Sequence, residues 1–476
     1  MAISLVLTIL SCSLSVDKHI SEASKERKGV IVQKLDSIGR HFINTGKVNG
    51  ISLAVCTRKD TLYNKGFGYT DSLKRTQVEN DDLFLLASVS KLVGATVVMK
   101  LVDEGKLSLD NTLLELLPDF PNQDQARDIT LRHLLSHTSG LLDYAMEIDD
   151  RYLQTGIDPT RDDFYSFFAR QELFFEPGEF YSYSNSGFLL MAMIIERLTG
   201  NSFQKEIDRV INQPTGLSIR LIAECIHDPK LSGYFELLDS TLVNRPHWLW
   251  IKGDGGLTSS AIDLARFPFY WSDGTLISNN SFEEMIAPVV LNNGVTTGYG
   301  TGVRTGTFEG EKVIGHTGGD KSTFAMMMYL PERDISIVVM VNTDNTPSDA
   351  LMIIGPVALA VLGKEAPRLD HLQTTGGSLS KYEGLYLTHE EKNRDFDSLL
   401  IYLNAEDNHL YMKPKGSDGN GVKYYYLGNH VFANERYPMD RSVFELNKKG
   451  EVVAFRNYWN GLFQQMGFRD HLFEGQ

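Results

Sequence analysis

Apolar residues recur at helical intervals near the start of the chain, and a more alternating pattern follows them. In VIVQKLDSIGRHFINTGKV the apolar positions are spaced as on one face of a helix: Val32, Leu35, Ile38 and Phe42. The next stretch, GISLAVCTRKDTLYNKGFGYTD, predicts two strands around a polar turn at residues 58–60. A second helix, within LLASVSKLVGATVVMKLVDEGKL, is predicted to end at Gly105. This order predicts an antiparallel sheet with a helix packed against it.

The strand pattern returns only in the second half of the chain. Residues 121–250 are predicted to be mostly helices and loops, with one strong helix in SGFLLMAMIIERLTG that ends at Gly200. Further on, TFAMMMYLPERDISIVVMVNTDN contains two apolar runs joined by a charged turn, and the helical SDALMIIGPVALAVLG follows it. Strands at both ends of the segment, with helices between them, predict a sheet assembled from distant parts of the chain.

The last quarter of the chain has a different pattern. The polar stretch KEAPRLDHLQTTGGSLS is typical of a linker. Beyond it, LLIYLNAEDNHLYMKP, KYYYLGNHVFANERY and SVFELNKKGEVVAFRNYW are short β-rich runs between turns, which predict a separate antiparallel barrel or sandwich. We therefore predict four segments, namely a leader and spacer, a large α+β domain, a linker and a β-barrel domain: 1–28, 29–365, 366–377 and 378–476.

The composition excludes several classes of function. With 42% hydrophobic and 22% charged residues, the chain has the composition of a globular protein. The formal net charge of -15 argues against a nucleic-acid partner, because no long Lys/Arg block offsets it. The three cysteines, Cys12, Cys56 and Cys225, lack metal-ligand spacing, and no HExxH motif occurs. We therefore expect no metal site.

The first residues, MAISLVLTILSCSLSVDK, contain an apolar run that is too short to span a bilayer but fits a secretion signal. The run ends in ILSC, which resembles the bacterial lipobox, where the cysteine becomes the lipidated first residue. We therefore expect an exported periplasmic or outer-membrane lipoprotein that is anchored at Cys12 and contacts the membrane only through that anchor. The usual positive residues are missing, so a buried or frayed N-terminal segment is the alternative. The sequence does not fix the oligomeric state.

One of four Ser-x-x-Lys tetrads lies in a chemically suggestive context. The four are Ser15–Lys18, Ser88–Lys91, Ser202–Lys205 and Ser378–Lys381. Only Ser88 opens a helix whose following residues are nearly all apolar. Residues three apart share a helix face, so the Lys91 amine can reach the Ser88 hydroxyl. The helix N-terminus favours negative charge, and burial disfavours the charged form of the lysine. An isolated tetrad of this kind is more often a core helix whose lysine extends to solvent.

Two further motifs bring groups that could complete such a site. YSN, at residues 183–185, precedes the strong helix that ends at Gly200. The Tyr183 phenol can share proton transfer with a lysine, and the Asn185 amide can bind a substrate carbonyl while it orients that lysine. HTGG, at residues 316–319, is predicted to begin an apolar strand, where glycines permit close approach of a substrate and leave an N–H as an oxyanion donor. Each motif alone is also compatible with a structural role.

Together, SVSK, YSN and HTG occur in the order found in a known family. They are accompanied by LRHLLSHTSGLLDY, PGEFYSYSNSGFLLMAMIIERLTG, GDGGLTSSAIDLARF and YLPERDISIVVMVNTDN. On these motifs, residues 30–365 resemble the serine β-lactamases and penicillin-recognising peptidases, in particular the class C β-lactamase-like branch. The resemblance implies an α+β fold in which an antiparallel sheet flanked by helices and a helical subdomain enclose a cleft. The C-terminal barrel resembles the lipocalin-like domain of some members, with aromatic residues expected in its core: Tyr424, Tyr425, Tyr426 and Trp459. A lid role for the loop at residues 413–421 is the alternative.

The resemblance also implies roles for individual residues. Ser88 would be the acylated nucleophile, Lys91 its base partner and Tyr183 a general base and acid. Substrate would be held by four residues, Asn185, His316, Thr317 and Gly318, and the oxyanion hole would be formed by the N–H groups of Ser88 and Gly319. His137 and Ser139 suggest a triad, but the family context makes them structural. No metal or organic cofactor is implied.

The implied reaction is acyl transfer from an amide, ester or lactam carbonyl through an acyl-enzyme. Efficient β-lactamases of this branch usually carry lysine where His316 stands, and a neutral histidine is a weaker anchor for a substrate carboxylate. D-amino-acid peptides or small esters are therefore the expected small-molecule or peptide substrates. The alternatives are a slow-turnover penicillin-binding or sensor protein, a true class C-like β-lactamase, and a structural envelope lipoprotein with an inert Ser88.

Overall fold

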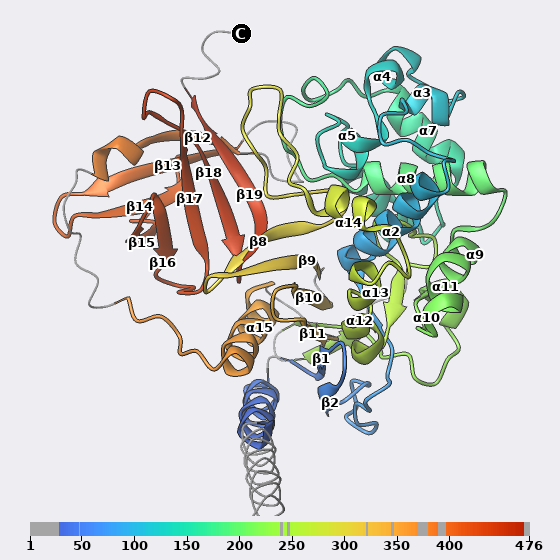
Figure 1. The fold of residues 1–476 in the computed structure, drawn as a ribbon, viewed down its shortest axis with the longest axis horizontal. Coiled ribbons are helices and arrows are strands. Elements are labelled where there is room, and N and C mark those ends of the chain that lie inside the picture. Colours follow the sequence, from blue (N-terminus) through green and yellow to red (C-terminus); the bar gives the residue numbers. More distant parts are fainter. Residues whose placement is uncertain are drawn as a thin grey trace, which may run out of the picture.

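A six-stranded antiparallel sheet forms the centre of the larger part of the molecule (Figure 1). The structure, a computed structural model, describes residues 28–46, 48–238, 241–244, 248–319, 322–343, 347–369, 379–388 and 397–470. In spatial order the sheet strands are β2 (Thr61–Gly68), β1 (Gly50–Thr57), β11 (Ile335–Val341), β10 (Phe324–Leu330), β9 (Glu311–Gly319) and β8 (Arg304–Phe308). The strand β1 pairs with β11 from the other end of the domain, for example Ala54 with Val338, and β2 continues the sheet beyond β1. The predicted assembly of the sheet from distant segments is thus confirmed.

The sheet is buried on both faces at β1, β10 and β11, because these strands alternate their side chains between two apolar clusters. In β10, Met326 and Met328 pack with α15 (Pro347–Leu362), whereas Met327 faces the cluster that contains α2 (Ser90–Asp103). The described part of the N-terminal helix, residues 28–44, contributes the fully buried Leu35 to the α15 side. This layered arrangement explains why the strands read as nearly continuous apolar runs.

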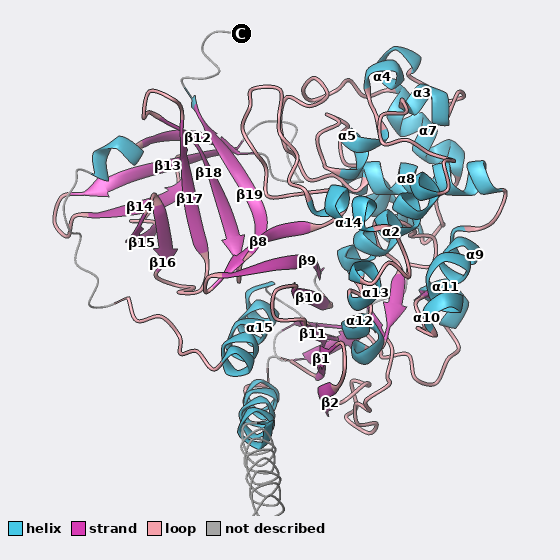
Figure 2. Ribbon diagram, in the orientation of Figure 1, coloured by secondary structure: helices cyan, strands magenta, loops and turns pink. Residues whose placement is uncertain are grey.

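Helices fill the other side of this domain (Figure 2). They are α3 (Leu113–Leu116), α4 (Gln123–Asp128), α5 (Leu131–Leu135), α6 (Ala145–Thr155), α7 (Arg161–Ala169), α8 (Ser186–Thr199), α9 (Phe203–Ile207), the π-helical η2 (Asp208–Asn212), α10 (Gln213–Thr215), α11 (Ile222–Cys225), α12 (Ala261–Arg266), α13 (Phe269–Ser272) and α14 (Asn279–Ile286). As predicted, α2 and α8 are closed by the left-handed glycines Gly105 and Gly200.

Two small sheets join this helical region to the rest. The strand β7 (Leu257–Ser259) lies between β3 (Phe84–Leu85) and β4 (Arg220–Leu221), and β5 (Phe235–Leu238) pairs with β6 (Thr241–Asn244). Between β3 and α2 lies the short 3-10 helix η1 (Ala87–Val89), which carries the predicted nucleophile. The position of this nucleophile is therefore set by two flanking elements.

The C-terminal part is a closed antiparallel barrel, as predicted (Figure 1). After η3 (Leu379–Tyr382), its strands in order are β12 (Gly384–Thr388), β13 (Asp397–Asn404), β14 (His409–Pro414), β15 (Val422–Gly428), β16 (Val431–Asn434), β17 (Arg441–Leu446), β18 (Val452–Trp459) and β19 (Leu462–Arg469). Tyr424 and Tyr426 pack against its core, but the predictions for Tyr425 and Trp459 are wrong. The Tyr425 hydroxyl donates to Glu435 outside the core cluster, and Trp459 is 37% exposed. Trp459 is the last residue of its strand, where the indole lies at the barrel surface.

The barrel is not as separate as its sequence suggests. An aromatic cluster, which we call the interdomain cluster, joins residues of the large domain to residues of β18 and β19. Its buried members are Phe175, Phe180, Tyr181, Leu291, Val295, Tyr299, Val453, Ala454, Tyr458, Phe463, Met466 and Phe468. The barrel therefore shares part of its apolar packing with the domain that carries the three motifs.

The predicted leader and its Cys12 lie outside the described residues. Within the described ranges, no helix combines the length and apolar character needed to cross a membrane. The same ranges contain no grouping of three or more His, Cys, Asp or Glu side chains suited to a metal ion.

Candidate active site

Ser88 lies at a sharp bend between β3 and α2. Ala87, directly before it, has a positive φ of 43°, which is strained for a residue with a Cβ. The bend is held because the Leu86 N–H donates to the carbonyl oxygen of Leu257 at 2.8 Å. Ser88 is thereby presented, half-buried, at the N-terminal end of α2.

Lys91 points from α2 directly at Ser88. Its Nζ lies 2.8 Å from Ser88 Oγ, 2.7 Å from Asn185 Oδ1 and 2.8 Å from the main-chain oxygen of Asp254. The lysine is fully buried. An amide oxygen and a peptide oxygen can only accept a proton, so Ser88 is the one of these three partners that can donate to a neutral amine. The geometry suits proton transfer from the hydroxyl to the amine.

The orientation of the Asn185 amide is fixed by a carboxylate. Asp143 Oδ2 accepts from both the main-chain N–H and the side-chain Nδ2 of Asn185, at 2.9 Å each. Because Nδ2 faces Asp143, the Oδ1 atom faces Lys91. The Asn185 side chain thus binds Lys91 through Oδ1 and Asp143 through one hydrogen of Nδ2. Only the second Nδ2 hydrogen remains for a substrate.

The ring of Tyr183 lies between two buried cations. Lys91 Nζ is 4.9 Å and the Arg304 guanidinium carbon 5.1 Å from its centroid. On another side, the His137 ring stacks on the phenol ring with 4.1 Å between centroids and 29° between planes. Tyr183 is thereby held close to both the Lys91 amine and the Arg304 guanidinium.

The HTGG motif ends strand β9; the prediction that it begins the apolar strand is wrong, since that strand starts at Phe324. The motif lies beside the bend that carries Ser88, the predicted nucleophile. A Cβ on Gly318 would lie 2.4 Å from the Leu86 oxygen and 2.6 Å from the Ser88 nitrogen. Glycine is therefore required here for the strand to approach Ser88.

His316 is a buried hydrogen-bonding residue. Its Nδ1 lies 2.5 Å from the Thr317 oxygen, which can only accept, so Nδ1 carries the proton and Nε2 accepts from Tyr299 Oη at 2.8 Å. Burial, followed by the charges of Arg304 and Lys91, holds the pKa of this histidine well below its usual range. Its neutral form agrees with the sequence-based expectation.

A second acidic group lies behind the lysine. Asp254 Oδ2 accepts from the Tyr144 hydroxyl at 2.6 Å, whereas its Oδ1 has no hydrogen-bond partner among the described residues. Burial raises the pKa of this carboxyl to about 6, although the Lys91 charge opposes the shift. Burial and the adjacent Asp254 also raise the pKa of Tyr144 well above its usual value.

Besides Asp143, two groups near the site were not found from the sequence, Arg304 and Gln464. Arg304, which is 6% exposed, donates from Nη1 to the carbonyl oxygens of Phe463 and Gln464 at 2.6 and 3.3 Å. The Thr317 hydroxyl donates to Gln464 Oε1 at 3.3 Å, so a barrel residue contacts the predicted substrate-binding strand. Neither position has a motif, because a contact between distant segments leaves no local pattern.

The other tetrads lie elsewhere. Ser202 caps α9 by accepting from the main-chain N–H of Lys205, and that lysine is exposed. Ser15–Lys18 and Ser378 lie outside the described residues. Of the predicted site residues, Ser88, Lys91 and Asn185 are in direct contact, and Tyr183 and β9 surround them.

The chain is similar to known proteins over most of its length. A profile of the family described as Beta-lactamase matches residues 29–361, more than half of the 476 residues. The chain belongs to the beta-lactamase family. It is a serine hydrolase of the beta-lactamase and penicillin-binding protein type.

Relatives of this beta-lactamase family member include penicillin-recognising proteins and amidases. A penicillin-binding protein of Bacillus subtilis (strain 168) is 29% identical over 382 residues, which are 75% of this chain and 82% of the relative. The octameric penicillin-binding protein homologue from Pyrococcus abyssi has a TM-score of 0.62 at 24% identity and covers 91% of this chain and 99% of its own. The D-amino acid amidase of Ochrobactrum anthropi SV3, solved with L-phenylalanine, has a TM-score of 0.59 at 23% identity, with coverages of 70% and 98%. At these identities the two structures show the fold alone.

Proposed function

We propose that this protein hydrolyses amide, ester or lactam carbonyls through an acyl-enzyme on Ser88, with D-amino-acid peptides or small esters as its preferred substrates. The observation that carries the proposal is the set of contacts at Lys91 Nζ, where two acceptor-only atoms leave Ser88 Oγ as the proton donor. A serine hydroxyl is a weak nucleophile until a neighbouring base takes its proton.

In the proposed reaction, Ser88 Oγ attacks the carbonyl carbon while its proton passes to Lys91. The carbonyl oxygen becomes an oxyanion beside the N–H groups of Ser88 and Gly319. The bond to the leaving group then breaks, Tyr183 passes a proton to the leaving nitrogen or oxygen, and the acyl-enzyme forms. Water attacks this ester and gives up a proton to Tyr183, Lys91 returns its proton to Ser88 Oγ as the bond to the acyl group breaks, and the acid leaves with Ser88 and Lys91 restored.

The choice of substrate rests on charge. His316 is neutral and hydrogen-bonded on both ring nitrogens, so it offers no permanent cation to a β-lactam carboxylate. Arg304, the other cation near Tyr183, is buried, and its Nη1 already donates to the carbonyl oxygens of Phe463 and Gln464. The name of the amidase relative also favours D-amino-acid derivatives.

The test is a panel of p-nitrophenyl esters, D-amino-acid amides and peptides, and nitrocefin, run on wild type and Ser88→Ala. We expect turnover of an ester or D-amino-acid substrate that exceeds nitrocefin turnover, and its loss in the variant. Covalent labelling of wild type by a fluorescent penicillin or a fluorophosphonate, absent in Ser88→Ala, checks the nucleophile. Labelling that persists in the variant would refute the assignment.

A slow-turnover penicillin-binding protein is the second candidate, and the name of the Bacillus subtilis relative favours it. It predicts rapid acylation of Ser88 by penicillin and an adduct that survives for hours. Intact-protein mass spectrometry over time separates the two candidates, because a hydrolase returns to its unmodified mass within minutes once the substrate is consumed.

We further propose export and lipidation at Cys12, on the strength of the ILSC pattern. Labelled palmitate is expected to appear on the wild-type protein in a bacterial host and to be absent from Cys12→Ala. Equal labelling, or no labelling, of the two proteins contradicts this proposal.

A further inference from the structure

The segment that runs from His137 to Asp143 contacts the YSN motif at both of its ends through hydrogen bonds. The main-chain N–H groups on either side of Tyr183 both donate to His137: Ser182 to its carbonyl oxygen at 2.9 Å, and Ser184 to its ring Nδ1 at 3.0 Å. The same imidazole stacks on the Tyr183 ring. One residue therefore contacts the phenol and both of its flanking peptide groups.

His137 has properties that packing alone does not require. It has a positive φ of 59° and is 2% exposed, and Nε2 has no hydrogen-bond partner among the described residues. Because Nδ1 accepts a main-chain N–H, the proton of the neutral ring must be on Nε2. Burial and the charges of Lys91 and Arg304 lower the pKa of this ring well below its usual range. Backbone strain and an unsatisfied buried group together point to a functional constraint.

Asp143 makes the equivalent contacts to the other end of the motif. Its Oδ2 accepts from both nitrogens of Asn185, and its Oδ1 accepts from the main-chain N–H of Ala145 at 2.9 Å. The carboxyl is 6% exposed. If the Asn185 amide were free to rotate, its NH₂ group would meet the Lys91 amine, and the lysine would lose an acceptor.

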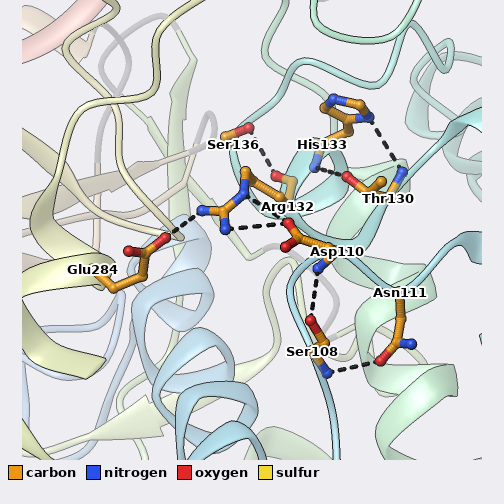
Figure 3. A network of polar contacts seen from close by, with 8 residues as sticks. All are labelled: Ser108, Asp110, Asn111, Thr130, Arg132, His133, Ser136 and Glu284. Atoms are coloured by element: carbon orange, nitrogen blue, oxygen red, sulfur yellow. Dashed lines mark hydrogen bonds and ion pairs between the residues drawn. The ribbon is translucent and has the colours of Figure 1, made fainter. Parts of the chain in front are cut away.

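The segment is itself anchored by the helix that precedes it (Figure 3). Figure 3 shows Arg132 of α5 between Asp110 and Glu284, with 3.3 Å from its Nη2 to Asp110 Oδ1. The start of α5 is closed by a capping box between Thr130 and His133. At its end, Ser136 Oγ donates to the Arg132 carbonyl oxygen at 2.8 Å. These contacts fix the end of α5, and therefore the position of the main chain at His137.

We propose that His137 and Asp143 are positioning residues for acylation, His137 acting through Tyr183 and Asp143 acting through Asn185. This inference rests on the proposed function, in which Tyr183 transfers protons and Asn185 orients Lys91. Neither residue touches the reacting atoms; each fixes a group that does.

A double-mutant cycle tests the Asp143 half of the proposal, with the acylation rate constant for a fluorescent penicillin as the readout. We expect Asp143→Ala to slow acylation by about 100-fold in the wild-type background and by less than about 3-fold in Asn185→Ala. The main-chain N–H of residue 185 still faces Asp143 in the Asn185→Ala background. Any slowing of acylation that comes from general damage to the structure therefore appears in both backgrounds and cancels in the comparison. Equal losses in the two backgrounds overturn the inference for Asp143.

A second cycle tests His137. His137→Ala is expected to slow acylation by about 30-fold, and the loss should shrink below about 3-fold in Tyr183→Phe. His137→Asn should recover about 10-fold of the loss, because asparagine tolerates the left-handed backbone and its amide oxygen can accept from the Ser184 N–H. Additive losses, or no recovery with asparagine, overturn the inference for His137.

The controls separate this inference from the proposed function. Ser139→Ala, on the same segment, is the matched control and should stay within about 3-fold of wild type, since Ser139 Oγ accepts only from Leu141 N–H among the described contacts. If Asn185→Ala and Tyr183→Phe themselves acylate at the wild-type rate, the proposed function fails instead. Thermal unfolding checks that each variant folds, and Asp143→Asn, which keeps the shape and one acceptor, replaces Asp143→Ala if the latter does not.

Discussion

At position 316, charge matters more than the size of the side chain. His316 accepts from Tyr299, donates to the Thr317 oxygen and lies near two buried cations. A lysine there could not accept a hydrogen bond from Tyr299, and it would add a buried positive charge near the Arg304 guanidinium. Its ammonium would have to be desolvated beside Lys91 and Arg304, which is costly. The lysine that efficient β-lactamases of this branch usually carry therefore cannot replace His316 here without other changes around it.

We accordingly predict that His316→Lys lowers the melting temperature and leaves the catalytic efficiency on nitrocefin within about 3-fold of wild type. Steady-state kinetics and differential scanning calorimetry on the purified proteins measure the two quantities. If the efficiency instead rose by about 10-fold or more at an unchanged melting temperature, the site would accept the cation and our account of His316 would be wrong.

Asp254 links stability to pH. Its pKa is raised to about 6, so the native carboxyl keeps its proton between about pH 4 and pH 6 while the unfolded chain releases it. The unfolded state then binds fewer protons, and the free energy of unfolding falls as the pH rises through this window, by on the order of 2–3 kcal/mol for this group. Urea unfolding of wild type and Asp254→Asn at pH 4.5 and pH 7.5 checks it. The fall should be smaller in the variant; an equal fall in the two proteins contradicts the prediction.

At the scale of elements, the close approach of β9 to η1 determines whether an oxyanion hole can form. We predict that Gly318→Ala slows covalent labelling of Ser88 by about 100-fold or more, because its Cβ would meet main-chain atoms of Leu86 and Ser88. Time-resolved labelling by a fluorophosphonate measures the effect. Gly29→Ala, in an open helical position with no atom within 4 Å of the new Cβ, is the control and should label at the wild-type rate.

The spacing of apolar residues predicted the helices that bury one apolar face and the strands that bury one or both faces. The helices α2 and α8, the hairpin of β1 and β2, and the barrel strands all have such patterns. The position of HTGG at the end of β9 was not predicted, because a strand boundary between two apolar runs has no local signal beyond the glycines. The bend at Ala87 was also missed, since its strained φ is imposed by flanking elements and not by an alanine preference.

At the scale of the whole molecule, the interdomain cluster packs the barrel against the domain that carries the candidate site. Motifs in known order predicted which residues approach Ser88, but Arg304, Gln464 and Asp143 were not found. Arg304 and Gln464 meet across domains, and Asp143 acts through a hydrogen bond whose partner is 42 residues away. Such contacts form only in the assembled fold, and no local pattern in the sequence indicates them.

Phe463 is where a coupling of the barrel to the site can be tested. It is fully buried in the interdomain cluster, and its carbonyl oxygen accepts from Arg304. We predict that Phe463→Ala lowers the free energy of unfolding by about 3–5 kcal/mol and also lowers the catalytic efficiency on the best ester substrate. Leu427→Ala, on a barrel side chain that is 38% exposed, should change neither by a measurable amount. Urea unfolding and steady-state kinetics decide; a stability loss without any kinetic change would separate the barrel from the site.

The contact between Gln464 and Thr317 has a consequence for how this protein can diversify. A gene that acquired a different barrel by recombination would also acquire a different neighbour for the predicted substrate-binding strand β9. Selectivity would then be inherited in part with the C-terminal domain, while Ser88 and Lys91 pass on unchanged in the other. Lineages that exchange barrels could therefore shift their preferred acyl donors in one step, without any substitution in the three motifs.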